Sequence, residues 1–328
     1  DSSWLTEVQI GTPPATLMLN FDSGSSDTWV MSTDLPVQER QGQVLYNPAS
    51  SKTALAAPSN TWNISYADKS GASGFVGTDT LYLGGMPIRN QAIQRATYVS
   101  KDFFSSRMAS GLLGLGFSSL NTVKPNPVRT PMENLIRQGT VQNPIFTVAL
   151  KDSNSNATGQ GGHFTFGYID KSTYKGEIGY APVNTSQGFW EVNCPYFKIG
   201  RNGNPLPRSQ PNHPAIIDTG TTLMLLDDMT LLTIYNSIPG AKFDSTIGGY
   251  TIPCNAQVPD TFWLLGDQFY GVPGSTMAFA KLDGGRCYGA MQSRGDFPTD
   301  IMGDAFIKNQ MVVFDQNPTA PRLGFAYR

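Results

Sequence analysis

The sequence contains little charge. Of its 328 residues, 15% are Asp, Glu, Lys or Arg, and the formal net charge is −2. It has no runs of lysine or arginine, which proteins use to bind nucleic acids or anionic membrane surfaces. No apolar stretch is long enough to span a bilayer. The composition therefore predicts neither a nucleic-acid partner nor a membrane partner.

Cysteine and histidine are also scarce. The three cysteines allow one disulfide and one remaining thiol. The only histidines, His163 and His213, stand beside Gly or Pro in loop-like contexts. The cysteines and histidines do not show zinc-site spacing, and HExxH, Walker and GxSxG motifs are absent. We therefore expect no metal and no cofactor.

Amphipathic helical periods are few. Residues 130–138 and 226–237 are the best candidates for helices. The 34 glycines and 23 prolines are scattered between short runs rich in Val, Ile, Thr, Phe and Tyr. This pattern is typical of an all-β protein with many turns, and the length favours two lobes over one.

A duplicated motif is the strongest signal in the chain. Residues 21–26 read FDSGSS, and residues 217–222, half a chain later, read IDTGTT. Each copy places one aspartate, Asp22 or Asp218, after an apolar strand-like run and before hydroxyl residues and a glycine. Two carboxylates brought face to face can share a proton, so that one acts as an acid and the other as a base. The duplication therefore predicts a catalytic pair, Asp22 and Asp218.

The motif resembles that of pepsin-like aspartic proteases of the secreted fungal type, the group of endothiapepsin and penicillopepsin. The resemblance runs nearly end to end. It is carried by an opening strand and turn, a flap, two apolar-apolar-Gly segments and a final strand, at residues 9–14, 62–66, 111–114, 300–304 and 312–326.

The resemblance implies an all-β, bilobal pepsin-like fold whose central cleft holds an extended peptide. The N-terminal lobe would comprise residues 1–185 and the C-terminal lobe residues 186–328. Water activated by Asp22 and Asp218 would hydrolyse peptide bonds at acidic pH, without a covalent intermediate. Monomeric state and inhibition by pepstatin-type compounds are further expectations.

The same resemblance implies roles for the residues around the two aspartates. Gly24 and Gly220 would let the backbone approach the carboxylates, and the hydroxyls of Ser23 and Thr219 would link the two loops. The hydroxyls of Ser25 and Thr221 would bond the outer carboxylate oxygens. Thr222 would add a further substrate contact. The alternating run that ends at Tyr66 and the turn after it read as a β-hairpin. In the family such a hairpin is a flap whose tyrosine contacts a tryptophan, here Trp29.

The flap departs from the fungal pattern. Ala67 and Lys69 stand where glycines are usual, and each costs roughly 1 kcal/mol if its position needs positive φ. Asp68 matches an aspartate that can favour lysine in the substrate, and Lys69 beside it could weaken that preference. Neutral drift explains these changes as well as altered specificity does.

Several features favour secretion or the vacuolar pathway. By resemblance, Cys254 and Cys287 form the C-terminal disulfide, which leaves Cys194 as a buried thiol. Asn63, Asn156 and Asn184 begin N-glycosylation sequons. The chain starts at Asp1 without a signal or pro-segment, so we expect a processed form derived from a zymogen.

Two other functions stay open. The fold could serve as a binding or inhibitor protein, although loss of one aspartate would be the usual sign of this. The pair could instead perform acid–base chemistry on a small molecule, with the altered flap as the clue. Glycosidases also use two carboxylates, but their chemistry requires neither the hydroxyl-glycine loops nor the flap.

Overall fold

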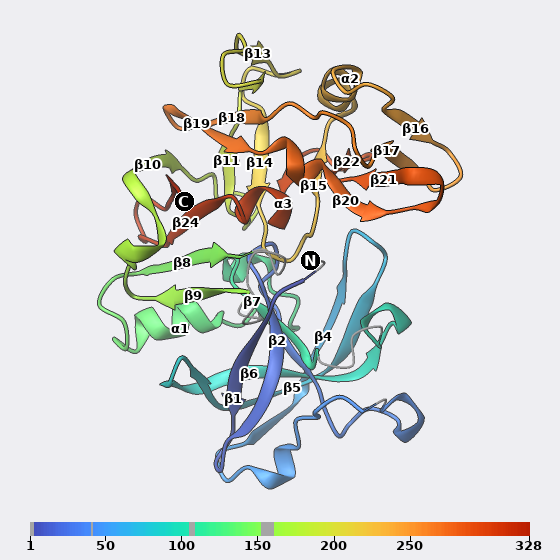
Figure 1. The fold of residues 1–328 in the computed structure, drawn as a ribbon. Helices are drawn as coiled ribbons and strands as arrows, with labels where there is room; N and C mark the ends of the chain where they lie inside the picture. Colours follow the sequence, from blue (N-terminus) through green and yellow to red (C-terminus); the bar gives the residue numbers. More distant parts are fainter. Residues whose placement is uncertain (1–2, 41, 105–108, 152–160) are drawn as a thin grey trace. The chain divides into compact units, whose positions relative to one another are not determined.

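The computed structural model describes residues 3–40, 42–104, 109–151 and 161–328, and most of its regular structure is β-strand. Contacts divide the described residues into two compact units (Figure 1). The N-terminal unit contains Ser3–Pro144 and Thr185–Phe189, and the C-terminal unit contains Ile145–Asn184 and Trp190–Arg328.

The N-terminal unit is built on one seven-stranded sheet. Its strands are, in spatial order, β1 (Leu5–Ile10), β2 (Ala15–Asp22), β7 (Gly111–Gly114), β3 (Thr28–Met31), β6 (Met86–Val99), β5 (Gly71–Leu83) and β4 (Leu55–Ser65). In β2, alternate residues Leu17, Leu19 and Phe21 are buried, as expected for a strand with one face on the core. The strand ends at Asp22, directly after the buried Phe21.

One helix and one hairpin of this unit match the sequence prediction. Helix α1 (Pro131–Arg137) begins where Thr130 accepts a hydrogen bond from the backbone N–H of Glu133, with Pro131 at its first position. Strands β4 and β5 pair antiparallel across the turn after Tyr66, which confirms the predicted hairpin.

The C-terminal unit contains a five-stranded sheet that joins distant parts of the sequence. Its strands are, in spatial order, β10 (Lys175–Pro182), β25 (Arg322–Tyr327), β24 (Gln310–Asp315), β8 (Ile145–Leu150) and β9 (Gly162–Phe166). Strands β8 and β10 bond to the last two strands of the chain. For this reason residues 145–184 group with the C-terminal unit, whereas the sequence placed them in an N-terminal lobe ending at residue 185.

Three smaller sheets complete the C-terminal unit. The first contains β11 (Glu191–Asn193), β14 (Pro214–Ile217), β23 (Asp300–Met302), β15 (Met224–Leu226) and β22 (Met291–Ser293). The second contains β13 (Leu206–Pro207), β12 (Tyr196–Ile199), β18 (Thr261–Leu265) and β19 (Gln268–Val272). The third contains β16 (Lys242–Asp244), β17 (Gly249–Pro253), β21 (Arg286–Gly289) and β20 (Ala278–Lys281).

Two short α-helices lie in the described part of this unit. Helix α2 (Asp228–Asn236) falls within the predicted range 226–237, and helix α3 (Asp304–Ile307) follows β23. Across the described part of the chain, no helix combines the length and apolarity needed to cross a bilayer.

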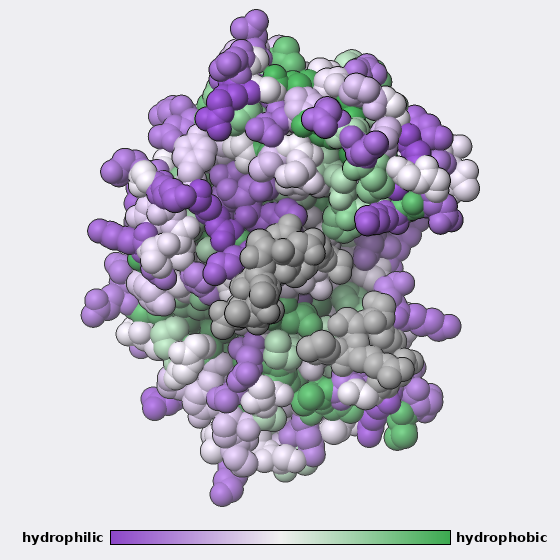
Figure 2. Space-filling model, viewed as in Figure 1, coloured by the Kyte–Doolittle hydropathy of each residue, from purple (hydrophilic) through white to green (hydrophobic). Residues whose placement is uncertain are grey.

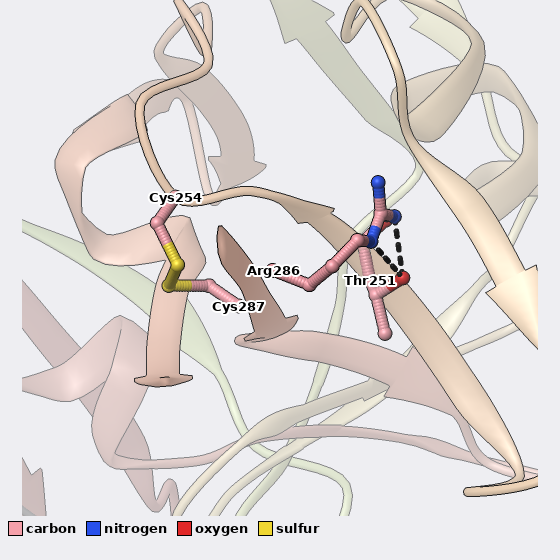
Figure 3. Close-up of a disulfide and its surroundings, with 4 residues drawn as sticks. All are labelled: Thr251, Cys254, Arg286 and Cys287. Atoms are coloured by element: carbon pink, nitrogen blue, oxygen red, sulfur yellow. Dashed lines mark hydrogen bonds between the residues drawn. A yellow bond between two sulfur atoms is a disulfide. The ribbon is translucent and has the colours of Figure 1, made fainter. Parts of the chain in front are cut away.

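The predicted disulfide is present. Cys254 and Cys287 are bonded and connect the end of β17 to β21 (Figure 3). Next to it, the guanidinium of Arg286 donates to the side chain and carbonyl of Thr251 on β17. Cys194 is buried and unbonded to another cysteine, as expected.

The surface of each unit mixes hydrophilic and hydrophobic residues on the face that Figure 2 shows. Among the exposed large apolar side chains, Val37 and Tyr168 lie in different segments of the chain, whereas Met229 and Leu232 both lie on α2. Scattered exposed apolar residues are usual on protein surfaces.

Candidate active site

Asp22 lies at the end of β2 and is 4% exposed. Its carboxylate is held by the loop that follows. The backbone N–H of Gly24 donates to Oδ1 at 2.8 Å, and the Ser25 hydroxyl donates to Oδ2 at 2.5 Å. One carboxylate oxygen is thus held by a backbone amide and the other by a hydroxyl.

Asp218 has the same environment in the other unit. It follows β14 directly and is 8% exposed. The backbone N–H of Gly220 donates to Oδ1 at 2.8 Å, and the Thr221 hydroxyl donates to Oδ2 at 2.5 Å. The two copies of the motif therefore fold into loops with the same pattern of donors and nearly identical distances.

The strands around the two loops also match. In the N-terminal unit, β7 runs parallel to β2 and antiparallel to β3, so it lies between the strands before and after Asp22. In the C-terminal unit, β23 takes the same place between β14 and β15. These inserted strands are the apolar-apolar-Gly segments recognised in the sequence.

Both inserted segments need glycine because backbone packs against them. A Cβ on Gly114 would lie 2.5 Å from the carbonyl carbon of Ser26. A Cβ on Gly303 would lie 2.2 Å from the carbonyl oxygen of Thr221. These distances are far below van der Waals contact, so the backbone around each aspartate is closely packed.

Tyr66 is placed by an aromatic cluster inside the N-terminal unit. The indole Nε1 of Trp29 donates to the Tyr66 hydroxyl at 2.8 Å, as the resemblance predicted. Phe103 meets both rings edge to face, at 5.1 Å from Trp29 and 5.7 Å from Tyr66. Burial, and next the charge of Asp22, raise the pKa of Tyr66 well above its usual value. The phenol therefore stays protonated, and its interaction with the charge of Asp22 places the base of the flap near that aspartate.

The flap tip is a tight turn after Tyr66. The carboxylate of Asp68 accepts from the backbone N–H and the hydroxyl of Ser70, at 2.9 and 2.6 Å, so Asp68 closes its own turn. Lys69 is exposed and has a φ of 70°. Among non-glycine residues that the structure describes, positive φ occurs at Lys69 and Asn90, so Ala67 does not carry the predicted strain.

The remaining predicted residues lie in varied settings. Ser23 and Thr219 are buried beside their aspartates, and Thr222 follows in the second loop. The sequon residues Asn63 and Asn184 are exposed, although Asn184 Nδ2 also donates to Glu191. Asn156 lies outside the described residues.

Sequence reasoning missed two buried charged sites. One is Asp27, which is fully buried and accepts hydrogen bonds from Thr122 and Gln94. The other is a cluster around Arg208 in the C-terminal unit. The only sequence signal for Asp27 was its position directly after the first motif, and the cluster around Arg208 had no local signal.

Comparison with known proteins decides the family. The family model for eukaryotic aspartyl protease matches residues 3–328. The chain belongs to the eukaryotic aspartyl protease family. Penicillopepsin-2 of Penicillium janthinellum is 42% identical over 328 residues, covering 99% of this chain and 78% of that relative. Aspergillopepsin-1 of Aspergillus pseudoglaucus is 42% identical over 326 residues, covering 99% of this chain and 79% of that relative.

Membership of the aspartyl protease family agrees with the fold and the paired loops. The mainly β, pepsin-like fold class is confirmed, and the chain is an aspartic endopeptidase. In this aspartyl protease, both aspartates of the duplicated motif are present in matching hydrogen-bonded loops.

Proposed function

We propose that Asp22 and Asp218 form a single proton-sharing dyad that hydrolyses peptide bonds at acidic pH. The observation that carries this proposal is that the two loops have the same hydrogen-bond pattern. Each holds one carboxylate oxygen by a glycine N–H and the other by a hydroxyl. Two carboxyl groups held in this way, one from each unit, can share a proton when they face each other.

The chemistry follows from having one proton on two carboxyl groups. The ionised carboxylate takes a proton from water, whose oxygen then attacks the peptide carbonyl carbon. The protonated carboxyl gives its proton to the carbonyl oxygen, which forms a neutral tetrahedral diol. When the diol collapses, the C–N bond breaks, a carboxyl group forms and the leaving nitrogen takes up a proton. The pKa values of such a pair belong to both groups together.

The fixed hydrogen bonds give each aspartate a defined orientation. Amide and hydroxyl donors stabilise the ionised form of a carboxylate. Both loops supply the same donors, so the two carboxyl groups have equivalent hydrogen-bonded settings. Ser23 and Thr219, which are buried, would link the loops and keep the geometry rigid.

We further propose that the hairpin ending at Tyr66 is a lid over a cleft that holds extended peptide. Its support is the hydrogen bond from Trp29 and the proximity of Tyr66 to Asp22. A lid of this kind excludes water and orders the substrate. Asp68 is hydrogen-bonded within its own turn and Lys69 beside it is exposed, so the positive charge of Lys69 would weaken any preference of Asp68 for basic substrate residues.

The setting of the enzyme is part of the same proposal. The disulfide, the exposed sequon residues Asn63 and Asn184, and the fungal relatives favour a secreted or vacuolar glycoprotein processed from a zymogen. A monomer inhibited by pepstatin-type compounds is expected. Neither a binding role nor small-molecule chemistry is favoured by a specific observation.

The test is cleavage of a mixed peptide library from about pH 2.5 to 7, with and without pepstatin. We expect cleavage on the acid side that pepstatin abolishes. Asp218→Asn should remove it, whereas Asp267→Asn, which makes the same change at an exposed aspartate, should not. A folded wild-type protein that cuts no peptide at any pH would contradict the proposal.

A further inference from the structure

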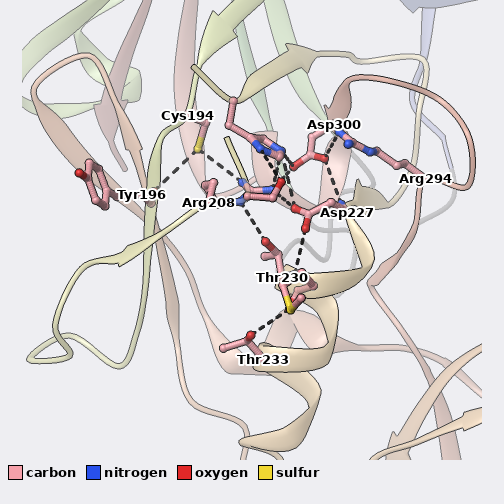
Figure 4. Close-up of polar contacts among 11 residues, drawn as sticks. Cys194, Tyr196, Arg208, Asp227, Thr230, Thr233, Arg294 and Asp300 are labelled. Atoms are coloured by element: carbon pink, nitrogen blue, oxygen red, sulfur yellow. Dashed lines mark hydrogen bonds and ion pairs between the residues drawn. The ribbon is translucent and has the colours of Figure 1, made fainter. Parts of the chain in front are cut away.

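A buried charge cluster lies inside the C-terminal unit, around the guanidinium of Arg208 (Figure 4). The side chains of Arg208, His213 and Asp300 are 0% exposed, and that of Asp227 is 10% exposed. Arg208 Nη2 donates to Asp227 Oδ2 at 2.7 Å and to Asp300 Oδ2, and it lies 3.0 Å from His213 Nε2. Arg294 adds a second guanidinium, donating to Asp300 Oδ1 at 2.8 Å.

The other nitrogens of Arg208 are also engaged. Nε donates to Thr230 Oγ1 at 3.0 Å, and Nη1 lies 3.9 Å from the Cys194 sulfur. Burial raises the pKa of Cys194 to about 12, so it stays a neutral thiol. The aromatic ring of Trp263 faces the guanidinium at 5.3 Å.

His213, Asp227 and Asp300 offer atoms close enough together to share a metal ion. The position of Arg208 argues against that use. Its Nη2 is already within hydrogen-bonding distance of the three candidate ligand atoms, and its positive charge would repel a cation. The cluster is therefore an ion-pair network.

The network joins segments that frame Asp218. Asp300 begins β23, and Asp227 precedes α2 and caps it by accepting from Thr230 N at 3.1 Å. Asp300 Oδ1 also accepts from the backbone N–H of Asp227 at 3.1 Å. His213 stands next to the start of β14, the strand that leads into Asp218.

A short path connects the network to the aspartate. Strand β23 pairs parallel to β14, and Met302, two residues after Asp300, accepts a hydrogen bond from the backbone N–H of Asp218 at 3.1 Å. The strand that Arg208 holds at one end therefore supports Asp218 at the other. This path reaches the backbone of Asp218, whereas the Asp218 carboxylate oxygens accept from Gly220 and Thr221.

Stability alone explains such a network poorly. Burying charges costs free energy, and replacing buried ion pairs with apolar residues is often neutral or stabilising. The guanidinium groups of Arg208 and Arg294 pair with the carboxylates of Asp227 and Asp300, two positive charges with two negative ones. A balanced network with directional bonds defines one arrangement of the strands it connects.

We propose that Arg208 is a positioning residue for the second catalytic loop, fixing β23 and thereby the backbone of Asp218. This inference rests on the proposed role of Asp218. A lysine cannot replace Arg208, because one ammonium nitrogen lacks the planar set of donors that reaches Thr230, Asp227 and Asp300 together.

The test compares Arg208→Lys with Arg322→Lys. Arg322 is a matched control, since it also pairs with an aspartate in this unit, at 2.8 Å from Asp315, and faces an aromatic ring. For Arg208→Lys we expect kcat to fall between about 10- and 100-fold, because small displacements of reacting groups have effects of this size. KM should stay within about twofold, since the variant keeps the substrate contacts. Arg322→Lys should match the wild type in both.

Amide hydrogen exchange supplies a readout that does not depend on activity. Exchange in residues 214–226 and 300–303 should accelerate in Arg208→Lys and not in Arg322→Lys. Unchanged exchange, or faster exchange with unchanged kcat, overturns the inference. If the wild type cuts no peptide, the proposed function fails, and the exchange comparison still decides whether Arg208 orders the Asp218 loop.

A second variant keeps the test decisive if Arg208→Lys does not fold. Asp300→Asn keeps the shape of the side chain and removes the charge that Arg208 and Arg294 share, so the same loss of kcat with preserved KM is expected. If both variants fail to fold, the network is a folding requirement and the positioning role is wrong.

Discussion

Lys69 has a backbone conformation that L-residues adopt at a cost. Its φ is 70°, whereas Ala67, two residues earlier in the same turn, does not have positive φ. Lys69→Gly should therefore stabilise the flap by up to about 1 kcal/mol. Ala67→Gly should destabilise it by about 0.5–1 kcal/mol, because glycine there only adds freedom to the unfolded chain.

Native-state hydrogen exchange of residues 61–75 would measure both changes locally. The two substitutions should change the stability of the flap in opposite directions, and this difference is the deciding result. Equal destabilisation by both glycines would mean that the turn does not strain Lys69.

Asp27 links stability to pH. Burial raises the pKa of its carboxyl, and hydrogen bonds from Thr122 and Gln94 offset only part of that rise. Its contribution to stability is fully present below the unfolded pKa of about 4 and is lost as pH rises through the raised folded pKa. Asp27→Asn cannot ionise, so its melting temperature should fall less between pH 4 and pH 7 than that of the wild type.

Thermal unfolding at several pH values would check this, with exposed Asp267→Asn as the control. The control should follow the wild-type pH dependence. If the melting temperature of Asp27→Asn falls between pH 4 and pH 7 as steeply as that of the wild type, ionisation of Asp27 does not lower stability at neutral pH.

At the scale of elements, local sequence patterns predicted the helices and the hairpin correctly. They did not predict the pairing of strands that lie far apart in the chain. The flap hairpin and helices α1 and α2 were predicted because their alternation, caps and turns lie within short windows. The grouping of residues 145–184 depends on pairing with β24 and β25, far along the chain, which no local pattern reveals. The same holds for Arg208, whose partners come from separate segments and whose burial contradicts the usual exposure of charge.

The disulfide constrains the pairing of β17 with β21. It connects cysteines separated by 33 residues, so the chain-entropy model gives it about 4 kcal/mol. The double variant Cys254→Ala/Cys287→Ala should therefore lower the free energy of unfolding by about that amount. Cys194→Ala, which removes a buried thiol and no cross-link, should cost about 1 kcal/mol.

Calorimetry of the two variants would separate cross-linking from loss of a buried sulfur. A loss for the double variant no larger than that for Cys194→Ala would mean that Arg286 and the strand ladder hold these strands without the disulfide.

At the scale of the whole molecule, the dyad that we propose takes one aspartate from each unit. The two loops repeat each other in sequence, strand arrangement and hydrogen bonding, although they come from different halves of the chain. Sequence reasoning predicted this repeat because each motif is local. The joint action of Asp22 and Asp218 as one dyad is the central claim.

The most direct test measures kcat/KM for one good peptide with Asp22→Asn, Asp218→Asn and the double variant. Each single change should lower kcat/KM by about 10²- to 10⁴-fold, the usual contribution of a positioned acid or base. Because a dyad acts as a unit, the double variant should be no worse than either single variant. Wild-type activity in either single variant, or losses that multiply in the double variant, would contradict the shared dyad.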